Sequence, residues 1–490
     1  MKNRFLFALP LLFTLSSCVV VFYGSTSLEP ISPYQDDKGE GYEKVSNFSF
    51  NLQNVKKTTK QIALDSLGDS TILVVPVQFS GSPSWTQTKL SVVEKGFFGA
   101  ASETSWQSVS SYYAASSYGK LNITGEVAPV LQMSITALQA SQHLSDDDQP
   151  APDELVVKAF ESSASYNSYR KTHDKNGDGY VDSVVFVYSN EIDSDSGYWA
   201  WVYWNNSDKN AANPSVNSYL WMSYNFFTGS SYAAYGSGID SHTAIHETGH
   251  LLGLDDYYQY DKNSTFDPSG ALEMQSFNIG DQNIYSKFAL GWVNPYYVKT
   301  ESEVTLKLRS SALYGDAVLI NDSWNHNSMD EYLIIEYYTP QGMNEKDARY
   351  RYTPNGKKAN KMYDESGFRI YHVDSRIVEL SRGQFQRYVD SLGKSSYAVG
   401  ASNSKSRSYL QEDFKDVYKY LHLLEASGKN TFKSGGIASN ATLFKTGSSF
   451  SASSEFFANG TAFNDGTEVG YRISINECAD EYGSVTISKI

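Results

Sequence analysis

Two histidines four residues apart, His246 and His250, constrain the fold of this chain more than any other feature. On an α-helix, such positions lie on one face about one turn apart, so both imidazoles can reach a single metal ion. Ser241 stands before them as a candidate helix N-cap. Gly253 follows them, where a left-handed turn can end a helix. The stretch therefore predicts a helix whose following residues turn back towards the metal.

A catalytic zinc ion needs three protein ligands and one open position. Asp256, three residues after Gly253, is the expected third ligand because its spacing matches the extended ligand pattern of such sites. Asp255, one residue earlier, is the alternative. Glu247 directly follows the first histidine, beside the open position, where a carboxylate can hold and deprotonate a water. We therefore expect a zinc site with Glu247 as general base.

The segment 246–256, HETGHLLGLDD, resembles the immune inhibitor A family (M6) of metallopeptidases in the metzincin clan. Further segments that resemble this family lie at 271–281, 285–293 and 367–374, and the likeness extends from about residue 70 to the C-terminus. The resemblance implies an extracellular zinc endopeptidase with a bilobal catalytic domain. It also implies that Met274 is the methionine of the Met-turn, which lies beneath the zinc.

Two positions near the ligands leave alternatives open. The residue before Asp256, commonly Pro in the family, is Asp255 here. Tyr258 is a candidate donor to the oxyanion of the tetrahedral intermediate, and the adjacent Tyr257 is the alternative. His242, one turn before the first ligand, is expected behind the ligands or on the surface rather than on the metal.

A second metal site is predicted by a loop that repeats the first nine positions of an EF-hand. The candidate calcium ligands are Asp174, Asn176, Asp178, the carbonyl of Tyr180, and Asp182. Gly179 allows the sharp turn, but Val185 stands where the twelfth position of an EF-hand has Glu. We expect a structural Ca²⁺ here, with an Asx-rich turn that binds no ion as the alternative.

The N-terminus has the pattern of an export signal. Lys2 and Arg4 precede an apolar run at 5–15, and two serines then precede Cys18, as in the lipobox of bacterial lipoproteins. We expect a lipid anchor at Cys18, on the extracellular face of a bacterial membrane. An ordinary cleaved signal, giving a secreted protein, and an uncleaved anchor are the alternatives. Cys478 is the only other cysteine, so an acylated Cys18 leaves no disulfide.

The chain is long enough for two folded domains. The expected order is a signal segment (1–23), a tether or pro-segment (24–66), an α/β metzincin-like zinc peptidase domain (67–297) and a β-rich, β-sandwich-like domain (298–490). In the first domain we expect strands at 71–79, 121–125, 183–188 and 198–204, and helices at 87–97 and 152–163. In the second we expect strands at 304–308, 332–338, 368–373, 420–424, 469–475 and 484–487, and solvated loops at 344–365 and 392–408.

The formal net charge of −15, without a stripe of Lys or Arg, argues against a nucleic-acid partner. The favoured hypothesis is an active endopeptidase that cleaves proteins or peptides. The alternative is a surface adhesin or binding lipoprotein with a vestigial metal site, and another zinc hydrolase, such as an amidase, comes third. The intact Glu247 favours the endopeptidase, because a decayed site has no chemical reason to keep that acid between two ligands.

Overall fold

The computed structural model describes most of the chain after residue 31. The described residues are 32–45, 52–54, 63–142, 150–205, 207–228, 238–259, 264–353, 360–375 and 419–490, with the backbone of strands β14 (Val378–Ser381), β15 (Gln384–Gln386) and β16 (Tyr397–Ala398). The expected signal segment with Cys18, and most of the loop expected at 392–408, lie outside these residues. In the described part, each helix is too short or too polar to cross a membrane.

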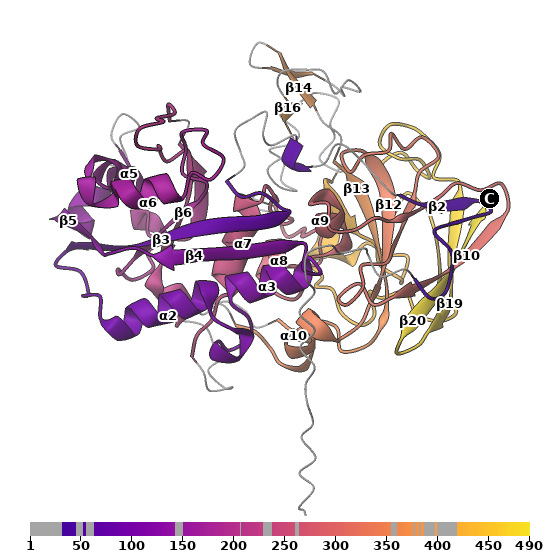
Figure 1. Ribbon diagram of the computed structural model, residues 1–490. Helices are drawn as coiled ribbons and strands as arrows, with labels where there is room; N and C mark the ends of the chain where they lie inside the picture. Colours follow the sequence, from indigo (N-terminus) through magenta and orange to yellow (C-terminus); the bar gives the residue numbers. More distant parts are fainter. Residues whose placement is uncertain are drawn as a thin grey trace, which may run out of the picture.

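The indigo-to-magenta half of the molecule is built on a six-stranded sheet (Figure 1). Its order is β4-β3-β6-β8-β7, and β5 also pairs with β3. The strands are β3 (Gly68–Ser80), β4 (Leu121–Val127), β5 (Leu131–Thr136), β6 (Val184–Tyr188), β7 (Trp201–Trp204) and β8 (Ser218–Ser223). β7 runs antiparallel to β8, whereas the other pairs are parallel. This edge strand contacts the helix that carries the two histidines.

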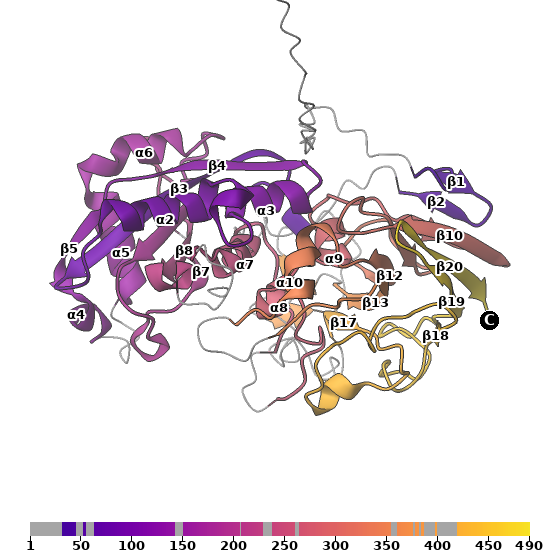
Figure 2. The same ribbon diagram turned by 90° about the horizontal axis from the view of Figure 1, so that it is seen from below.

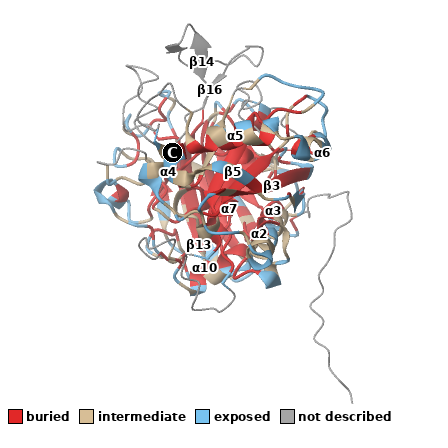
Figure 3. Ribbon diagram, turned by 90° about the vertical axis from the view of Figure 1, so that its left-hand side faces the viewer, coloured by how far each residue is buried: buried red, intermediate tan, exposed pale blue. Residues whose placement is uncertain are grey.

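Helices cover both faces of this sheet, as a largely parallel sheet requires. The five residues of β6, VVFVY, are all buried and alternate between two hydrophobic cores. The first face carries α5 (Pro152–Ser162) and α6 (Asn167–Thr172), with the short α4 (Ala137–Ser141) beside them. The other face carries α2 (Gln87–Phe98), α3 (Val109–Ser116) and α7 (His242–Leu251). Figure 3 shows α7 within the buried interior.

The orange-to-yellow half contains two further sheets, seen from two directions in Figures 1 and 2. The seven-stranded sheet has the order β1 (Lys38–Gly39), β2 (Tyr42–Lys44), β9 (Tyr296–Val298), β11 (Ala317–Ile320), β12 (Glu331–Tyr338), β13 (Gly367–Asp374) and β17 (Leu421–Leu423). The four-stranded sheet has the order β10 (Glu303–Arg309), β20 (Tyr482–Lys489), β19 (Tyr471–Cys478) and β18 (Ser449–Ser451). Residues of both sheets share one hydrophobic core.

The two halves also share a core, because the long sheet is buried on both faces. Along β12, Leu333, Ile335 and Tyr337 point into the core between the two sheets. The intervening Ile334 and Tyr338 point instead into the core that contains α7. This same core includes α8 (Met274–Phe277) and α9 (Ile284–Ala289), which lie at the junction in Figure 2. One continuous apolar interior therefore joins the helix with the histidines to the C-terminal sheet.

The mixed α/β character expected from the sequence is confirmed, and each predicted strand and helix overlaps an observed element. β8 and β11 were not anticipated; both are short apolar runs, which periodicity alone does not distinguish from buried helix segments. The expected domain boundary, between residues 297 and 298, falls inside β9.

The prediction of a solvated loop at 344–365 is wrong for the residues that the structure describes there. This segment contains α10 (Glu345–Arg349), and Asp347, Tyr352 and Met362 are buried against the first half of the molecule. Its many charged residues suggested exposure, but the aromatic and apolar residues between them decide its packing.

The segment 24–66, expected to be a tether or pro-segment, is partly folded. Its residues 38–44 form the hairpin β1–β2, which extends the seven-stranded sheet through pairing of β2 with β9. Further along, Leu52 is fully buried, and Gln53 donates hydrogen bonds to the carbonyls of Leu64 (2.8 Å) and Leu252 (3.3 Å). Gln53 thus satisfies a free carbonyl at the C-terminal end of α7.

Candidate metal centre

Helix α7 begins after Ser241, as expected, but the serine hydroxyl does not cap it. That hydroxyl donates to the carbonyl of Gly96 (2.9 Å), and Asp240 Oδ1 accepts from the amide of His242 (3.1 Å). Ser241 is therefore the N-cap residue by position, as expected, but its side chain does not cap the helix. A carboxylate takes that role, in a position where the helix dipole also favours negative charge.

His246 and His250 lie on one face of α7, with their Nε2 atoms 3.2 Å apart. Each Nδ1 faces a backbone carbonyl: Met274 O at 2.7 Å for His246, and Leu254 O at 2.8 Å for His250. A carbonyl can only accept, so each Nδ1 carries the proton. In the neutral imidazoles, both Nε2 lone pairs are therefore directed at the same point, as metal-binding histidines require.

Asp256 completes the cluster because the chain reverses after α7. Gly253 adopts a φ of +98°, and the amide of Leu254 bonds back to the carbonyl of Gly249 (2.9 Å). This turn brings Asp256 Oδ1 to 3.1 Å from His246 Nε2 and 3.4 Å from His250 Nε2. Among the described His, Cys, Asp and Glu side chains, these three form the only set with ligand atoms within 4.8 Å of one another.

The dimensions of this cluster fit a tetrahedral zinc ion. Three ligand atoms about 2.0–2.1 Å from zinc at tetrahedral corners would lie about 3.3 Å apart. The three separations here are 3.1, 3.2 and 3.4 Å. Two imidazole nitrogens and one carboxylate oxygen are also a ligand set that suits zinc and leaves a fourth corner open.

Asp255, the alternative third ligand, lies outside this set. It is buried, and after burial itself its negative charge is among the causes that raise the pKa values of Tyr257 and Tyr420, on the core side of the chain. The two consecutive aspartates therefore face different surroundings, as alternate residues of an extended segment do.

The cluster favours positive charge at its centre. Burial alone would lower the pKa of His250, but the carboxylate of Asp256 outweighs burial and raises it to about 10. Burial would raise the pKa of Asp256, but the two imidazoles hold it well below its usual range. Metal binding at this cluster would therefore have to displace a proton from His250.

Glu247 lies beside the cluster, and its side chain has a buried carboxylate oxygen that a small polar ligand could bind. It is 6% exposed, and its Oε2 has no hydrogen-bond partner among the described residues. Burial raises the pKa of its carboxyl group, an effect that His246 and His250 oppose. A buried carboxylate oxygen without a protein partner is costly, and a bound water would relieve that cost.

Of the two neighbouring tyrosines, Tyr258 is the one beside the cluster. Burial and the charges of Asp256 and Glu247 raise the pKa of its phenol, and it hydrogen-bonds Asp256. Tyr257 is fully buried elsewhere, with its hydroxyl 2.5 Å from Ser286 Oγ. The geometry therefore separates the two candidates that sequence spacing left open.

The segment around Met274 lies directly against the histidine helix. The Met274 side chain is fully buried in the shared core, while its carbonyl accepts from His246. Gln275 donates to the carbonyl of His246 (3.1 Å), and its own carbonyl accepts from the amide of Tyr257 (2.8 Å). Sequence reasoning missed Gln275. The one local signal was Gly249, since a glycine inside a helix often marks a close approach.

The nine-residue loop 174–182 is tightly turned, with both of its glycines at positive φ. Its side-chain oxygens accept from its own amides: Asp178 N bonds Asp174 Oδ1 (3.0 Å) and Asn176 Oδ1 (2.9 Å), and Tyr180 N bonds Asp178 Oδ1 (2.9 Å). Burial and the charges of Asp174 and Asp178 raise the pKa of Asp182 to about 6. Val185 lies in β6, as expected. Calcium binding by this loop stays a prediction.

His242 is fully buried, so of the two positions expected for it the surface one is excluded. Its ring is stacked between Trp106 (4.2 Å between centroids) and Tyr352 (4.0 Å). Its Nδ1 lies 2.5 Å from Asp240 Oδ1, and its Nε2 lies 3.6 Å from Asp347 Oδ2. It anchors the start of α7 and is not part of the ligand set.

No protein-family model matches this chain, and no curated protein shows significant similarity to it. The function of this protein is therefore inferred from the motifs of its sequence and from the geometry of this centre.

Proposed function

We propose that this protein is a zinc-dependent endopeptidase whose metal is held by His246, His250 and Asp256. The observation that carries the proposal is the near-equilateral triangle of their ligand atoms, with edges of 3.1, 3.2 and 3.4 Å. A tetrahedral ion in this triangle keeps one corner free for a reacting group. Glu247, one residue after the first ligand, supplies a buried carboxylate beside that corner.

The chemistry follows from these groups. When bound, zinc would lower the pKa of a water and polarise the scissile carbonyl. Glu247 accepts a proton from that water as the oxygen attacks the carbonyl carbon, and later gives it to the leaving amine nitrogen as the C–N bond breaks. Tyr258, with its hydroxyl beside Asp256, donates to the developing oxyanion.

An extended peptide is the substrate that the surroundings of the centre favour. β7 is the last strand of its sheet in the described part of the chain, and it contacts α7. A free strand edge can pair with an extended segment through backbone hydrogen bonds. A peptide paired there would run past the helix that carries the ligands, which supports peptide cleavage over other zinc hydrolyses.

The proposal includes membership of the immune inhibitor A-like peptidases of the metzincin clan. It is supported by the turn at Gly253, by Asp256 as third ligand, and by the close contact of Met274 with His246. We further propose that the two facing sheets of the second half form a β-sandwich-like domain, which their common core supports.

We also propose that the enzyme acts outside the cytoplasm. This part of the proposal is supported by the lipobox-like pattern that ends at Cys18. Calcium bound at 174–182 would then be structural: it would stiffen the entry to β6 in a chain in which a lipid on Cys18 leaves no second cysteine for a disulfide. Extracellular calcium is plentiful, so a weak site would suffice.

The test is casein zymography of a soluble form that begins after Cys18, with matched variants of two glutamates. Wild type should cleave casein, lose activity with a chelator and regain it with zinc. Glu247→Gln should keep its zinc but lose activity by on the order of 100-fold or more. Glu94→Gln, at an exposed helix position, should behave as wild type.

Two outcomes would overturn the proposal. Wild-type activity in Glu247→Gln would exclude the mechanism. A wild-type protein that binds zinc but cleaves neither casein nor a peptide library would favour a binding lipoprotein with a vestigial site.

A further inference from the structure

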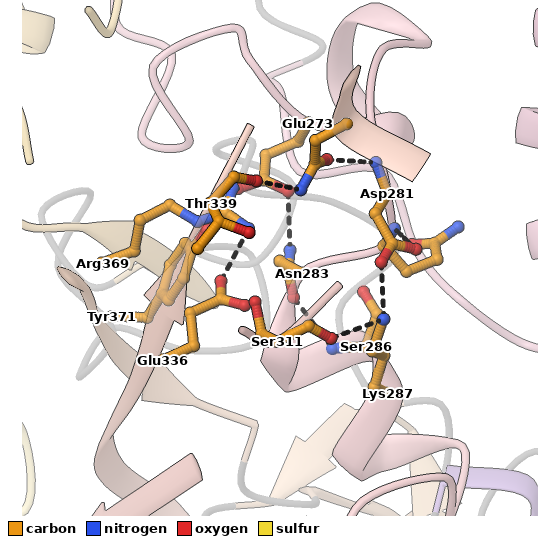
Figure 4. Close-up of polar contacts among 12 residues, drawn as sticks. Glu273, Asp281, Asn283, Ser286, Lys287, Ser311, Glu336, Thr339, Arg369 and Tyr371 are labelled. Atoms are coloured by element: carbon orange, nitrogen blue, oxygen red, sulfur yellow. Dashed lines mark hydrogen bonds and ion pairs between the residues drawn. The ribbon is translucent and has the colours of Figure 1, made fainter. Parts of the chain in front are cut away.

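Glu273, the residue before Met274, is held from three sides by buried polar groups (Figure 4). Tyr371 donates to its Oε1 (2.5 Å), and Asn283 Nδ2 donates to its Oε2 (3.1 Å). Arg369 Nη1 lies 3.5 Å from the same Oε1. The glutamate is 1% exposed, so these groups, and not water, set its position.

The backbone of Glu273 is fixed as well as its side chain. Its carbonyl accepts from the amides of Ser276 (3.2 Å) and Phe277 (2.9 Å), which makes it the N-cap of α8. Met274 is therefore the first residue of a turn whose entry is clamped by a carboxylate. The side-chain contacts and the α8 turn thus hold the residue that directly precedes Met274 from both sides.

Arg369 and Tyr371 are themselves rigid, because both lie in the middle of β13. Glu336, on the neighbouring strand β12, is the register partner of Arg369 and forms an ion pair with its Nη2 at 2.7 Å. The rings of Tyr338 and Tyr371 lie 5.1 and 5.7 Å from the guanidinium. A buried arginine needs such charge partners, because an unpaired buried charge is costly.

The chain of contacts ends at a metal ligand. From Arg369 and Tyr371 it passes through Glu273 to Met274, whose carbonyl accepts from His246 Nδ1 at 2.7 Å. Groups that hold the far side of a ligating imidazole set its tautomer and its angle to the metal, and their loss typically weakens binding by about 10–100-fold. The strand β13 thus acts on the metal centre from the C-terminal sheet.

We infer that Arg369 and Tyr371 are positioning residues of the metal centre: by clamping Glu273 they hold the Met274 carbonyl that orients His246. The inference rests on the proposed function, and it assigns the C-terminal sheet a part in metal binding. It explains why a strand far along the sequence carries an arginine in a fully buried position.

The experiment compares two conservative variants in the full chain. Tyr371→Phe removes the hydroxyl that bonds Glu273 and keeps the ring beside Arg369. Tyr332→Phe is the matched control: Tyr332 is also fully buried, on β12, and its hydroxyl donates to the carbonyl of Ser328 (2.8 Å). Zinc affinity is measured by competition with a chromophoric chelator, thermal stability by circular dichroism, and peptide hydrolysis at saturating zinc.

We expect Tyr371→Phe to bind zinc about tenfold more weakly than wild type, and Tyr332→Phe to stay within about twofold of it. At saturating zinc, kcat per folded molecule, with the folded fraction taken from circular dichroism, should fall in Tyr371→Phe while KM stays unchanged. Arg369→Lys, which keeps the charge but not the planar fork, should weaken zinc binding less than Arg369→Met.

The inference would be overturned if both tyrosine variants bound zinc as tightly as wild type. It would also be overturned if both variants lost zinc affinity to the same extent, since that would mean a general loss of stability. A wild-type protein that binds zinc tightly but cleaves no peptide would instead count against the proposed function, and would leave the affinity comparison valid.

Discussion

The contact between Gly249 and Gln275 predicts the effect of Gly249→Ala on stability, in which better helix propensity is opposed by steric crowding. A Cβ at position 249 would lie 2.4 Å from Gln275 Oε1 and 2.8 Å from its Cδ and Nε2. Gln275 is fully buried, and its amide is held at both ends: Nε2 donates to His246 O (3.1 Å), and Oε1 accepts from Gln282 (3.0 Å). The side chain therefore has no free direction in which to retreat.

Gly249→Ala would gain about 1 kcal/mol from helix propensity. Against this, forcing a methyl group into a filled site costs about 1–3 kcal/mol. Displacing the amide weakens two buried hydrogen bonds, each contributing about 0.5–1.5 kcal/mol. The steric and hydrogen-bond costs together exceed the gain in helix propensity, and we expect a net loss of about 2 kcal/mol in the free energy of unfolding.

The assay is urea denaturation of four proteins: wild type, Gly249→Ala, Gln275→Ala and the double variant. In the Gln275→Ala background, the new methyl group enters vacated space, so Gly249→Ala should become neutral or stabilising there. The two changes should couple by about 2–3 kcal/mol. A stabilising Gly249→Ala in the wild-type background, or the same effect in both backgrounds, would refute the reasoning.

Three further predictions concern charged residues. Asp256→Ala should weaken zinc binding by on the order of 100-fold or more in a chelator competition, whereas Asp255→Ala should leave it near wild type; the reverse order would make Asp255 the ligand. Burial raises the pKa of Glu273 from 4.5 to about 7, so its stabilising contribution is complete below pH 4.5 and is lost as pH rises through 7. The difference in the free energy of unfolding between pH 5 and pH 8, measured by urea denaturation, should be smaller in Glu273→Gln than in wild type. Equal differences in the two proteins would contradict this. Calcium added to the zinc-loaded protein should raise the thermal midpoint of wild type and of Asp195→Asn, an exposed control, but not of Asp178→Asn; no rise in wild type would remove the proposed calcium site.

The candidate ligands could be predicted from the sequence because their geometry is local. Helical spacing puts His246 and His250 on one face, and the glycine turn at 253 returns the chain to them within three residues. Each step depends only on backbone conformations that short sequence patterns favour. The choice between Asp255 and Asp256 followed from spacing, and the cluster in the structure contains Asp256.

The support around the ligands could not be predicted, because it depends on pairing over long distances in the sequence. Arg369 meets Glu336 only through the register of β12 and β13, and Glu273 meets both strands only after the two halves pack together. No spacing rule links residues 273 and 369. Charge content even misled the prediction at 344–365, where Asp347 is buried between the amide of Gly280 and the ring of His242.

The shared core also predicts that the first half cannot fold alone. A chain that ends at residue 295 would lose β11, β12 and β13, whose apolar side chains line the core beside α9. Leu319, Ile334 and Tyr338 are all fully buried there, and each large buried side chain contributes about 1.5–3 kcal/mol. Losing several of them would use up the 5–15 kcal/mol by which domains are typically stable. We expect the truncated protein to bind a hydrophobic dye and to unfold without a cooperative urea transition, whereas the full chain unfolds cooperatively. A cooperative transition in the truncated form would mean that the metal centre has a self-sufficient fold, and the C-terminal sheet would then be a separable module after all.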